Sequence, residues 1–166
     1  MNRALIIIDM QEITVGKKHS NLFNYDENLI EKINKYIKYF DNDNVIYIRN
    51  IMKNNLINKL SPLKCYKGTF ESELVENLNI VSNNIFDKYE GNAFSNKKLN
   101  DYLKTNNIDE LELVGVDGGG CISLSAFGAI KEDYHVIINE KLVGTMFNKR
   151  KEKYFKKLKK IGVKFQ

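Results

Sequence analysis

The chain has 166 residues, the length of one domain, and a domain of this size buries roughly 70% of the surface that its unfolded chain exposes. An apolar fraction of 43% and a charged fraction of 28% exclude disordered and fibrous classes, while two cysteines exclude a disulfide framework and favour a reducing compartment, the cytoplasm. The two histidines, His19 and His135, nearly exclude a multi-histidine metal site, and the net charge of +5 leaves nucleic acid or an anionic membrane open as partners.

Short apolar runs recur along the chain and are typical of buried strands. The first comprises Ala4 to Ile8 and ends at Asp9, so it is too short for a membrane span and lacks the cleavage site of a signal peptide. A β-branched run that ends in an acid favours a buried parallel strand. Similar runs lie at 45–48, 84–86, 111–116 and 135–138, with a weaker one at 163–165.

Helical patterns separate these runs. Apolar spacing predicts an amphipathic helix over 26–40, Ser95 is a candidate N-cap for a helix that ends near 106, and 121–131 forms a mostly apolar helix. A last helix carries an apolar stripe of Phe147, Tyr154, Phe155, Leu158 and Ile161. Strands that alternate with helices predict an α/β fold: a three-layer αβα, Rossmann-like, doubly wound parallel sheet of about six strands in one domain, 1–166.

Residues 51–82 fit this alternation poorly, since they contain Pro62 and only short helical pieces such as Glu71 to Leu78. A long irregular stretch in a compact domain is often a binding loop or lid, and a surface insertion is an equally good interpretation. Cys65 lies in this stretch, in a sequence setting that gives its thiol no chemical role.

Three chemically useful side chains follow predicted strands. Asp9 follows the first strand, Lys88 the third, and Cys121 follows the fourth strand after three glycines. Ligands of open α/β sheets bind at the carboxyl ends of the strands, so these three side chains should converge. A cysteine at a helix N-terminus is expected to have a lowered pKa and to be a nucleophile, and an aspartate could exchange a proton with it. A buried, inert cysteine and a structural Asp9–Lys88 ion pair are the alternatives.

The glycine run Gly118–Gly120 has two interpretations. Glycines allow a tight turn that brings backbone N–H groups to an oxyanion, and they also make the loop mobile. The run could instead bind a phosphate, but it lacks the order of glycines of a dinucleotide fingerprint, and the P-loop and Gly-x-Ser-x-Gly patterns are absent. A nucleotide-binding domain is therefore the less favoured alternative.

Three motifs together resemble one family. They are Ala4-Leu5-Ile6-Ile7-Ile8-Asp9-Met10-Gln11, Lys88-Tyr89-Glu90-Gly91-Asn92-Ala93-Phe94 and Val114-Gly115-Val116-Asp117-Gly118-Gly119-Gly120-Cys121-Ile122, each at a strand end. In this order they resemble the isochorismatase-like cysteine hydrolases, the superfamily of nicotinamidase and N-carbamoylsarcosine amidohydrolase.

The resemblance implies a hydrolase that cleaves a C–N bond of a small amide or ureide through a cysteine thioester. It implies a catalytic triad of Asp9, Lys88 and Cys121, a cis peptide bond between Val116 and Asp117, and an oxyanion hole made of the backbone N–H groups of Asp117 and Cys121. It also implies a homo-oligomer without a cofactor. The nearby side chains of Tyr89, Asn92 and Phe94 are candidates for the substrate pocket.

Departures from the family pattern qualify this assignment. Nicotinamidases carry a metal site after the second strand, where this chain reads Arg49-Asn50-Ile51-Met52-Lys53, so a metal-independent enzyme fits better. Asn92 stands where the family usually has Ser, and the glycine run is unusual. A non-catalytic or weakly active ligand-binding or scaffold protein of the same fold is therefore the alternative function.

The positive charge is concentrated at one end. Residues 147–166 hold nine Lys or Arg and one acid, Glu152, so that this segment carries +8 and residues 1–146 carry −3. Because the lysines alternate with an apolar stripe, they are expected to form a solvated helix face. We therefore expect a small-molecule substrate as the partner, and neither a membrane nor nucleic acid.

Overall fold

The computed structural model describes residues 1–18 and 20–166, so His19 lies outside the described residues. Within them, six strands form one parallel sheet in the order β3-β2-β1-β4-β5-β6. The chain reverses its direction of travel across the sheet between β1 and β4, which is the arrangement of a doubly wound fold. The strands are β1 (Arg3–Ile8), β2 (Val45–Asn50), β3 (Ile85–Lys88), β4 (Glu110–Val116), β5 (His135–Gly144) and β6 (Lys164–Phe165).

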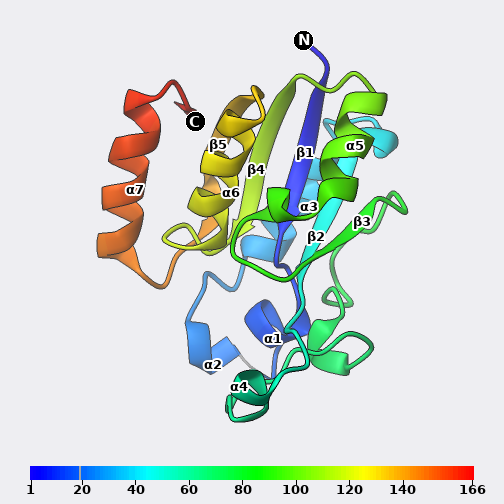
Figure 1. The fold of residues 1–166 in the computed structure, drawn as a ribbon, viewed down its shortest axis with the longest axis vertical. Helices are drawn as coiled ribbons and strands as arrows, with labels where there is room; N and C mark the ends of the chain where they lie inside the picture. Colours follow the sequence, from blue (N-terminus) through cyan, green and yellow to red (C-terminus); the bar gives the residue numbers. More distant parts are fainter. Residues whose placement is uncertain (19) are drawn as a thin grey trace.

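Helices cover both faces of the sheet, which confirms the three-layer α/β prediction (Figure 1). One face packs against α5 (Lys97–Thr105), α6 (Cys121–Lys131) and α7 (Asn148–Lys160), and the other against α3 (Leu29–Ile37). The short helices α1 (Glu12–Val15), α2 (Ser20–Phe23) and α4 (Leu56–Lys59) gather beyond the carboxyl ends of the strands (Figure 1). Single 3₁₀ turns lie at Asn42–Asn44, Phe70–Ser72 and Ala93–Ser95.

The central strand explains why both faces need helices. In β1, Ala4, Ile6 and Ile8 belong to the core cluster beneath α5, α6 and α7, whereas Leu5 and Ile7 belong to the cluster beneath α3. All five side chains are fully buried. Successive side chains of a strand point to opposite faces, so an unbroken apolar run is stable only between two apolar layers.

Some element boundaries differ from the sequence-based prediction. β5 continues to Gly144, past a register shift against β4, and so carries the chain to the carboxyl edge of the sheet. The N-cap of α5 is Asn96, whose side chain accepts a hydrogen bond from the N–H of Lys98, and not Ser95. Phe147 and Ile161 lie outside α7 and are 45% and 48% exposed, so the buried stripe of that helix is shorter than predicted.

Backbone hydrogen bonds join the irregular segment 51–82 to itself and to the residues that follow β1. The N–H of Met52 donates to the carbonyl of Cys65 (2.7 Å), that of Glu12 to the carbonyl of Glu73 (2.9 Å), and that of Val75 to the carbonyl of Met10 (3.1 Å). The helix expected from Glu71 to Leu78 is wrong, because only the 3₁₀ turn ending at Ser72 forms there.

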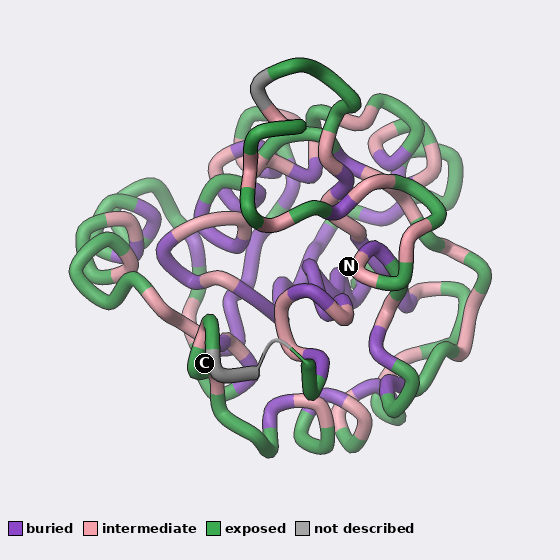
Figure 2. The backbone as a smooth tube through the Cα atoms, turned by 90° about the horizontal axis from the view of Figure 1, so that it is seen from below, coloured by how far each residue is buried: buried purple, intermediate pink, exposed green. Residues whose placement is uncertain are grey.

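The segments that connect strands and helices cover the carboxyl edge of the sheet, and they contain both buried and exposed residues. Viewed from that side, buried stretches lie in the middle of the molecule and exposed loops surround them (Figure 2). Among the described residues, no helix is both long enough and apolar enough to cross a membrane.

Candidate active site

The three side chains predicted to converge do so. Lys88 Nζ donates to Asp9 Oδ2 at 3.0 Å and to Cys121 Sγ at 3.2 Å. Lys88 is 1% and Asp9 3% exposed, so the ion pair lies inside the protein. A buried charge is stable only when it is paired, and the long lysine stem lets a residue of β3 reach past β2 to the ends of β1 and β4.

Asp9 keeps one carboxylate oxygen free. Its backbone has φ 55°, a left-handed conformation that aspartate tolerates better than most residues, and its N–H donates to the carbonyl of Ile48 at 2.9 Å. Oδ2 binds Lys88, whereas Oδ1 is buried and has no hydrogen-bond partner among the described residues. Oδ1 is therefore available to accept a proton from a neighbouring group.

The electrostatics of Cys121 correct the expectation of a lowered pKa. Burial, together with the negative charge of Asp9, raises the pKa of the Cys121 thiol to about 12, although Lys88 acts in the opposite direction. Burial by itself would lower the pKa of Lys88, but the charges on Asp9 and Cys121 hold it above its usual value. The resting site therefore contains a protonated thiol beside an ammonium group, with a carboxylate oxygen at hand.

The turn between β4 and α6 offers two backbone donors. The peptide bond between Val116 and Asp117 is cis. In the described part of the chain, the N–H groups of Asp117 and Cys121 donate to no protein acceptor. Gly115 brings this turn close to β1, because it has φ 111° and a Cβ there would lie 2.2 Å from the carbonyl oxygen of Ile8. The turn thus presents unused N–H groups next to the thiol.

The glycine run is held by contacts, which corrects the expectation of a mobile loop. A Cβ on Gly119 would lie 2.6 Å from the carbonyl oxygen of Phe147, so only glycine allows the loop to pack this closely against the start of α7. The N–H of Gly118 donates to the carbonyl of Gly144, that of Gly119 to Asp117 Oδ1, and that of Gly120 to the carbonyl of Asp117. Since all three N–H groups have partners inside the protein, the loop has none of them free for a phosphate.

A pocket of about 320 Å³ opens next to Cys121. Most of its wall is apolar, with a few polar and charged groups, as is typical of sites for small molecules. The described residues that line it are Asp9, Gln11, Ile13, Thr14, Phe23, Tyr25, Asn50, Met52, Ser61, Leu63, Cys65, Val116, Asp117, Gly120, Cys121, Met146, Phe147 and Arg150.

The three residues proposed from sequence to line the substrate pocket are not among the residues that line the pocket beside Cys121. Tyr89 is 48% exposed. The side chain of Asn92 accepts a hydrogen bond from the N–H of Phe94 at 2.9 Å and so caps the start of the 3₁₀ turn Ala93–Ser95. The Phe94 ring packs on Tyr134, with 5.7 Å between centroids. After Lys88 the chain turns towards α5 and α6, so closeness in sequence to Lys88 does not bring these residues to the pocket.

The pocket also contains side chains that the sequence analysis did not select. Met146, Phe147 and Arg150 follow β5, and Asn50 and Met52 lie at and beyond the end of β2. The rule that ligands bind at carboxyl ends could have found all five, had it been applied to every strand. Phe23, at the end of α2, and Tyr25, in the connection to α3, stack with 5.8 Å between ring centroids and reach the pocket from a region for which no sequence signal exists.

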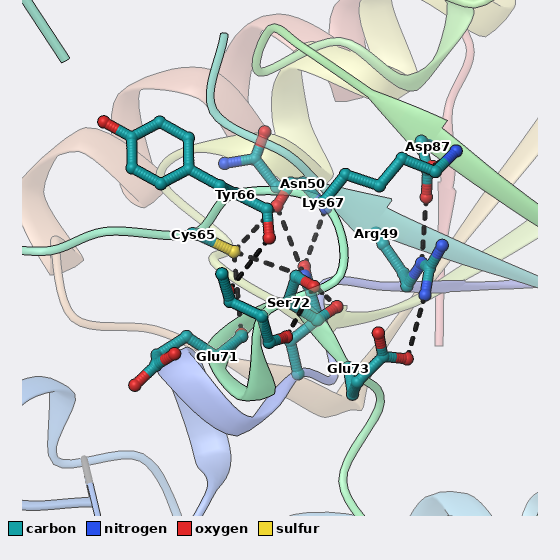
Figure 3. Close-up of polar contacts among 11 residues, drawn as sticks. Arg49, Asn50, Cys65, Tyr66, Lys67, Glu71, Ser72, Glu73 and Asp87 are labelled. Atoms are coloured by element: carbon teal, nitrogen blue, oxygen red, sulfur yellow. Dashed lines mark hydrogen bonds and ion pairs between the residues drawn. The ribbon is translucent and has the colours of Figure 1, made fainter. Parts of the chain in front are cut away.

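Gln11 holds segment 51–82 against one side of the pocket, where Cys65 of that segment also lies. The Gln11 amide donates to the carbonyls of Asn50 (3.2 Å) and Ser72 (2.9 Å), and its oxygen accepts from the N–H of Asn50 (2.7 Å). The Cys65 thiol donates to the carbonyls of Asn50 and Glu71 (Figure 3). Burial raises the pKa of the Cys65 thiol to about 11. Segment 51–82 is therefore a wall of the pocket, as the binding-loop interpretation expected.

The groups near the end of β2 do not fit a divalent metal ion. Zinc prefers thiolate, imidazole and carboxylate ligands. Here Arg49 is paired with Asp87 at 2.8 Å (Figure 3), and Asn50 and Met52 are the side chains that face the pocket. The Asp9 carboxylate, which also lines the pocket, is already paired with Lys88. Across the described residues, no cluster of three or more His, Cys, Asp or Glu side chains is arranged to hold a metal.

The chain also matches a known protein family. Residues 3–166 match the family model described as the isochorismatase domain. The chain belongs to the isochorismatase family. Among curated proteins, none matches it.

Solved structures of isochorismatase-like proteins share its fold at low identity. An isochorismatase-like hydrolase from Alkaliphilus metalliredigens is 23% identical, with a TM-score of 0.85 over 100% of this chain and 95% of that one. N-carbamoylsarcosine amidase from Thermoplasma acidophilum is 22% identical, with a TM-score of 0.82 over 100% and 96%. Pyrazinamidase of Pyrococcus horikoshii, solved in complex with zinc, is 20% identical, with a TM-score of 0.81 over 100% and 99%.

Proposed function

We propose that this member of the isochorismatase family is a metal-independent cysteine hydrolase that cleaves a C–N bond of a small amide or ureide. The observation that carries the proposal is the position of Lys88 Nζ, within 3.0 Å of Asp9 Oδ2 and 3.2 Å of Cys121 Sγ beside a pocket of small-molecule size. An acid, a cation and a thiol held this close can divide nucleophile activation and proton transfer among them.

The first half of the reaction forms a thioester. As a substrate carbonyl approaches, Asp9 Oδ1 accepts the thiol proton, and Sγ of Cys121 forms a bond to the carbonyl carbon. The carbonyl oxygen takes the displaced electron pair, and the N–H groups of Asp117 and Cys121 donate to it. When the C–N bond breaks, Asp9 returns its proton to the departing nitrogen, so that ammonia or an amine leaves and a thioester remains.

The second half releases the acid. Water attacks the thioester carbon while Asp9 accepts a proton from it, and the C–S bond then breaks. The proton returns from Asp9 to the sulfur, which restores the thiol. The raised pKa of Cys121 supports this sequence, because a thiol that is protonated at rest requires the neighbouring base at the moment of attack. Lys88 keeps its charge throughout and offsets the negative charge on the carboxylate or the sulfur.

An amide panel tests the proposal. The purified protein is incubated with small primary amides and ureides, and ammonia release is measured together with the intact mass of the protein. We expect turnover of at least one substrate, and an acyl adduct on the peptide that contains Cys121 and not on the one that contains Cys65. A protein that releases no ammonia and forms no adduct contradicts catalysis and favours the ligand-binding or scaffold alternative.

We also propose that the protein lies in the cytoplasm and that it forms a homo-oligomer. Several apolar side chains are well exposed on the side of the molecule that carries the short helices, among them Leu56 (80%) and Leu60 (85%). Single exposed leucines are common, but two that lie at the start of α4 and directly after it favour a contact surface. Size-exclusion chromatography with light scattering should give a mass above the 19.3 kDa of one chain. A monomer at micromolar concentration would contradict this part.

A further inference from the structure

Asp117 is unusual among the pocket residues because its side chain joins three separate segments. Oδ1 accepts a hydrogen bond from the N–H of Gly119 at 2.7 Å, within its own loop. Oδ2 accepts one from the N–H of Met146, in the connection from β5 to α7, and one from the hydroxyl of Tyr25 at 3.3 Å, in the connection from α2 to α3. Each of these segments also lines the pocket.

Backbone hydrogen bonds and the close approach of Gly119 to Phe147 hold the loop that carries Asp117, but the glycine run adds no side-chain contacts of its own. Gly118, Gly119 and Gly120 have no side chains, and glycine loses more backbone freedom on ordering than any other residue. The loop nevertheless has to hold the N–H groups of Asp117 and Cys121 beside the thiol. Hydrogen bonds to a charged acceptor are about twice as strong as neutral ones, so the three bonds to this carboxylate are the strongest local restraint on the loop.

We propose that the Asp117 carboxylate is a positioning residue that clamps the glycine loop to Met146 and Tyr25 and thereby aims the two oxyanion donors. This inference rests on the proposed function, because it assigns Asp117 a side-chain role in the same reaction in addition to its backbone N–H. The three glycines and the aspartate form one unit: the glycines allow the close approach to the start of α7, and the carboxylate provides the rigidity that the missing side chains do not.

The test variant is Asp117→Asn, which keeps the shape of the side chain but places an NH₂ group where an oxygen accepts hydrogen bonds. That NH₂ group would face the N–H of Gly119 or of Met146, so at least one bond is lost and two donors oppose each other. Asp101→Asn, on the exposed surface of α5, makes the same change of charge away from the site and serves as the matched control.

Three readouts separate positioning from a general structural role. We expect kcat for amide hydrolysis to fall by about 10- to 100-fold in Asp117→Asn, with KM changed by less than about threefold, since misplaced donors act in the transition state. Alkylation of Cys121 by iodoacetamide should stay within about twofold of wild type, because this displacement develops no oxyanion at the donors. Amide hydrogen exchange in peptides covering Gly119 and Met146 should become at least about tenfold faster.

Other results would overturn the inference. These are a kcat within about threefold of wild type, an unchanged exchange rate, or a loss of alkylation that parallels the loss of kcat. If Asp117→Asn does not fold, Tyr25→Phe removes only the longest of the three bonds and should lower kcat by about two- to fivefold, with the same pattern in the other readouts. A wild-type protein that is inert towards every amide overturns the proposed function instead, and the exchange rates then decide by themselves whether the carboxylate fixes the loop.

Discussion

The ion pair between Lys88 and Asp9 makes a quantitative prediction, because both groups are almost completely buried. Lys88→Met keeps most of the volume of the side chain and removes its charge. Asp9 Oδ2 then loses the partner that lies 3.0 Å away, while Oδ1 already lacks one among the described residues. The variant therefore leaves a carboxylate inside the protein without a counter-charge.

The expected size of the effect follows from two comparisons. At 3.0 Å and an effective dielectric constant of about 20, the attraction between two unit charges is about 5 kcal/mol. Removal of one partner of a buried pair typically costs about 3–5 kcal/mol, compared with a total stability of about 5–15 kcal/mol for a domain. Lys88→Met should therefore remove a large share of the free energy of unfolding.

Urea unfolding followed by circular dichroism measures this change. With a slope of about 2 kcal/mol per M, the midpoint should fall by about 1.5–2.5 M. Asp9→Asn keeps the left-handed backbone at position 9, since asparagine also tolerates φ near 55°. The double variant Asp9→Asn/Lys88→Met should be more stable than the sum of the single losses predicts, by about 2 kcal/mol or more. A loss below about 1 kcal/mol in Lys88→Met, or additive losses in the double variant, would refute the reasoning.

Three further predictions concern the thiol and the glycine loop. Cys121→Ser should lower ammonia release by at least about 10²-fold, because a hydroxyl is a far weaker nucleophile here, and near-normal turnover would exclude the thioester route. Asp9→Asn should lower the pKa of the Cys121 thiol, since it removes a negative charge that raises this pKa; a pH titration of thiolate absorbance that gives an unchanged or higher pKa would contradict that sign. Gly119→Ala should lower the free energy of unfolding by about 1–3 kcal/mol, because its Cβ would lie 2.6 Å from a backbone oxygen, as thermal melts would reveal. Gly91→Ala, whose Cβ meets only the end of one flexible leucine, should change it by less than about 0.5 kcal/mol.

The proposed catalytic residues could be found in the sequence because each lies at the end of a strand or in the turn that follows it. Parallel strands bring their carboxyl ends to one edge of the sheet, so Asp9, Lys88 and Cys121 have to approach one another once the strand order is that of a doubly wound fold. Tyr89 and Phe94 lie outside the lining of this pocket for a different reason. They follow Lys88 in sequence, but nothing in a one-dimensional pattern tells in which direction a loop turns after its strand ends.

The pKa of Cys121 depends on its burial and on its distances from Asp9 and Lys88, which cannot be read from the sequence. A helix N-terminus by itself lowers a thiol pKa, and that local rule was the basis of the expectation from sequence. Asp9 is far from Cys121 in the chain but close to it in space. Burial of the thiol and the negative charge of Asp9 outweigh the effect of the helix N-terminus and raise the pKa of Cys121 to about 12. Local rules fail here because electrostatic interactions depend on separation in space and on exposure to water.

Periodicity and strand ends thus sufficed to infer the layers of the fold and the three side chains of the site, since burial alternates with a fixed period along each element. The family was inferred from the resemblance of three sequence motifs. Tertiary packing alone revealed the rest: the wall formed by segment 51–82, the aromatic pair Phe23 and Tyr25, and the three bonds to the Asp117 carboxylate. These depend on how the connections fold over the sheet edge. A loop has no period, and its path is set by contacts with segments that lie far away in the chain.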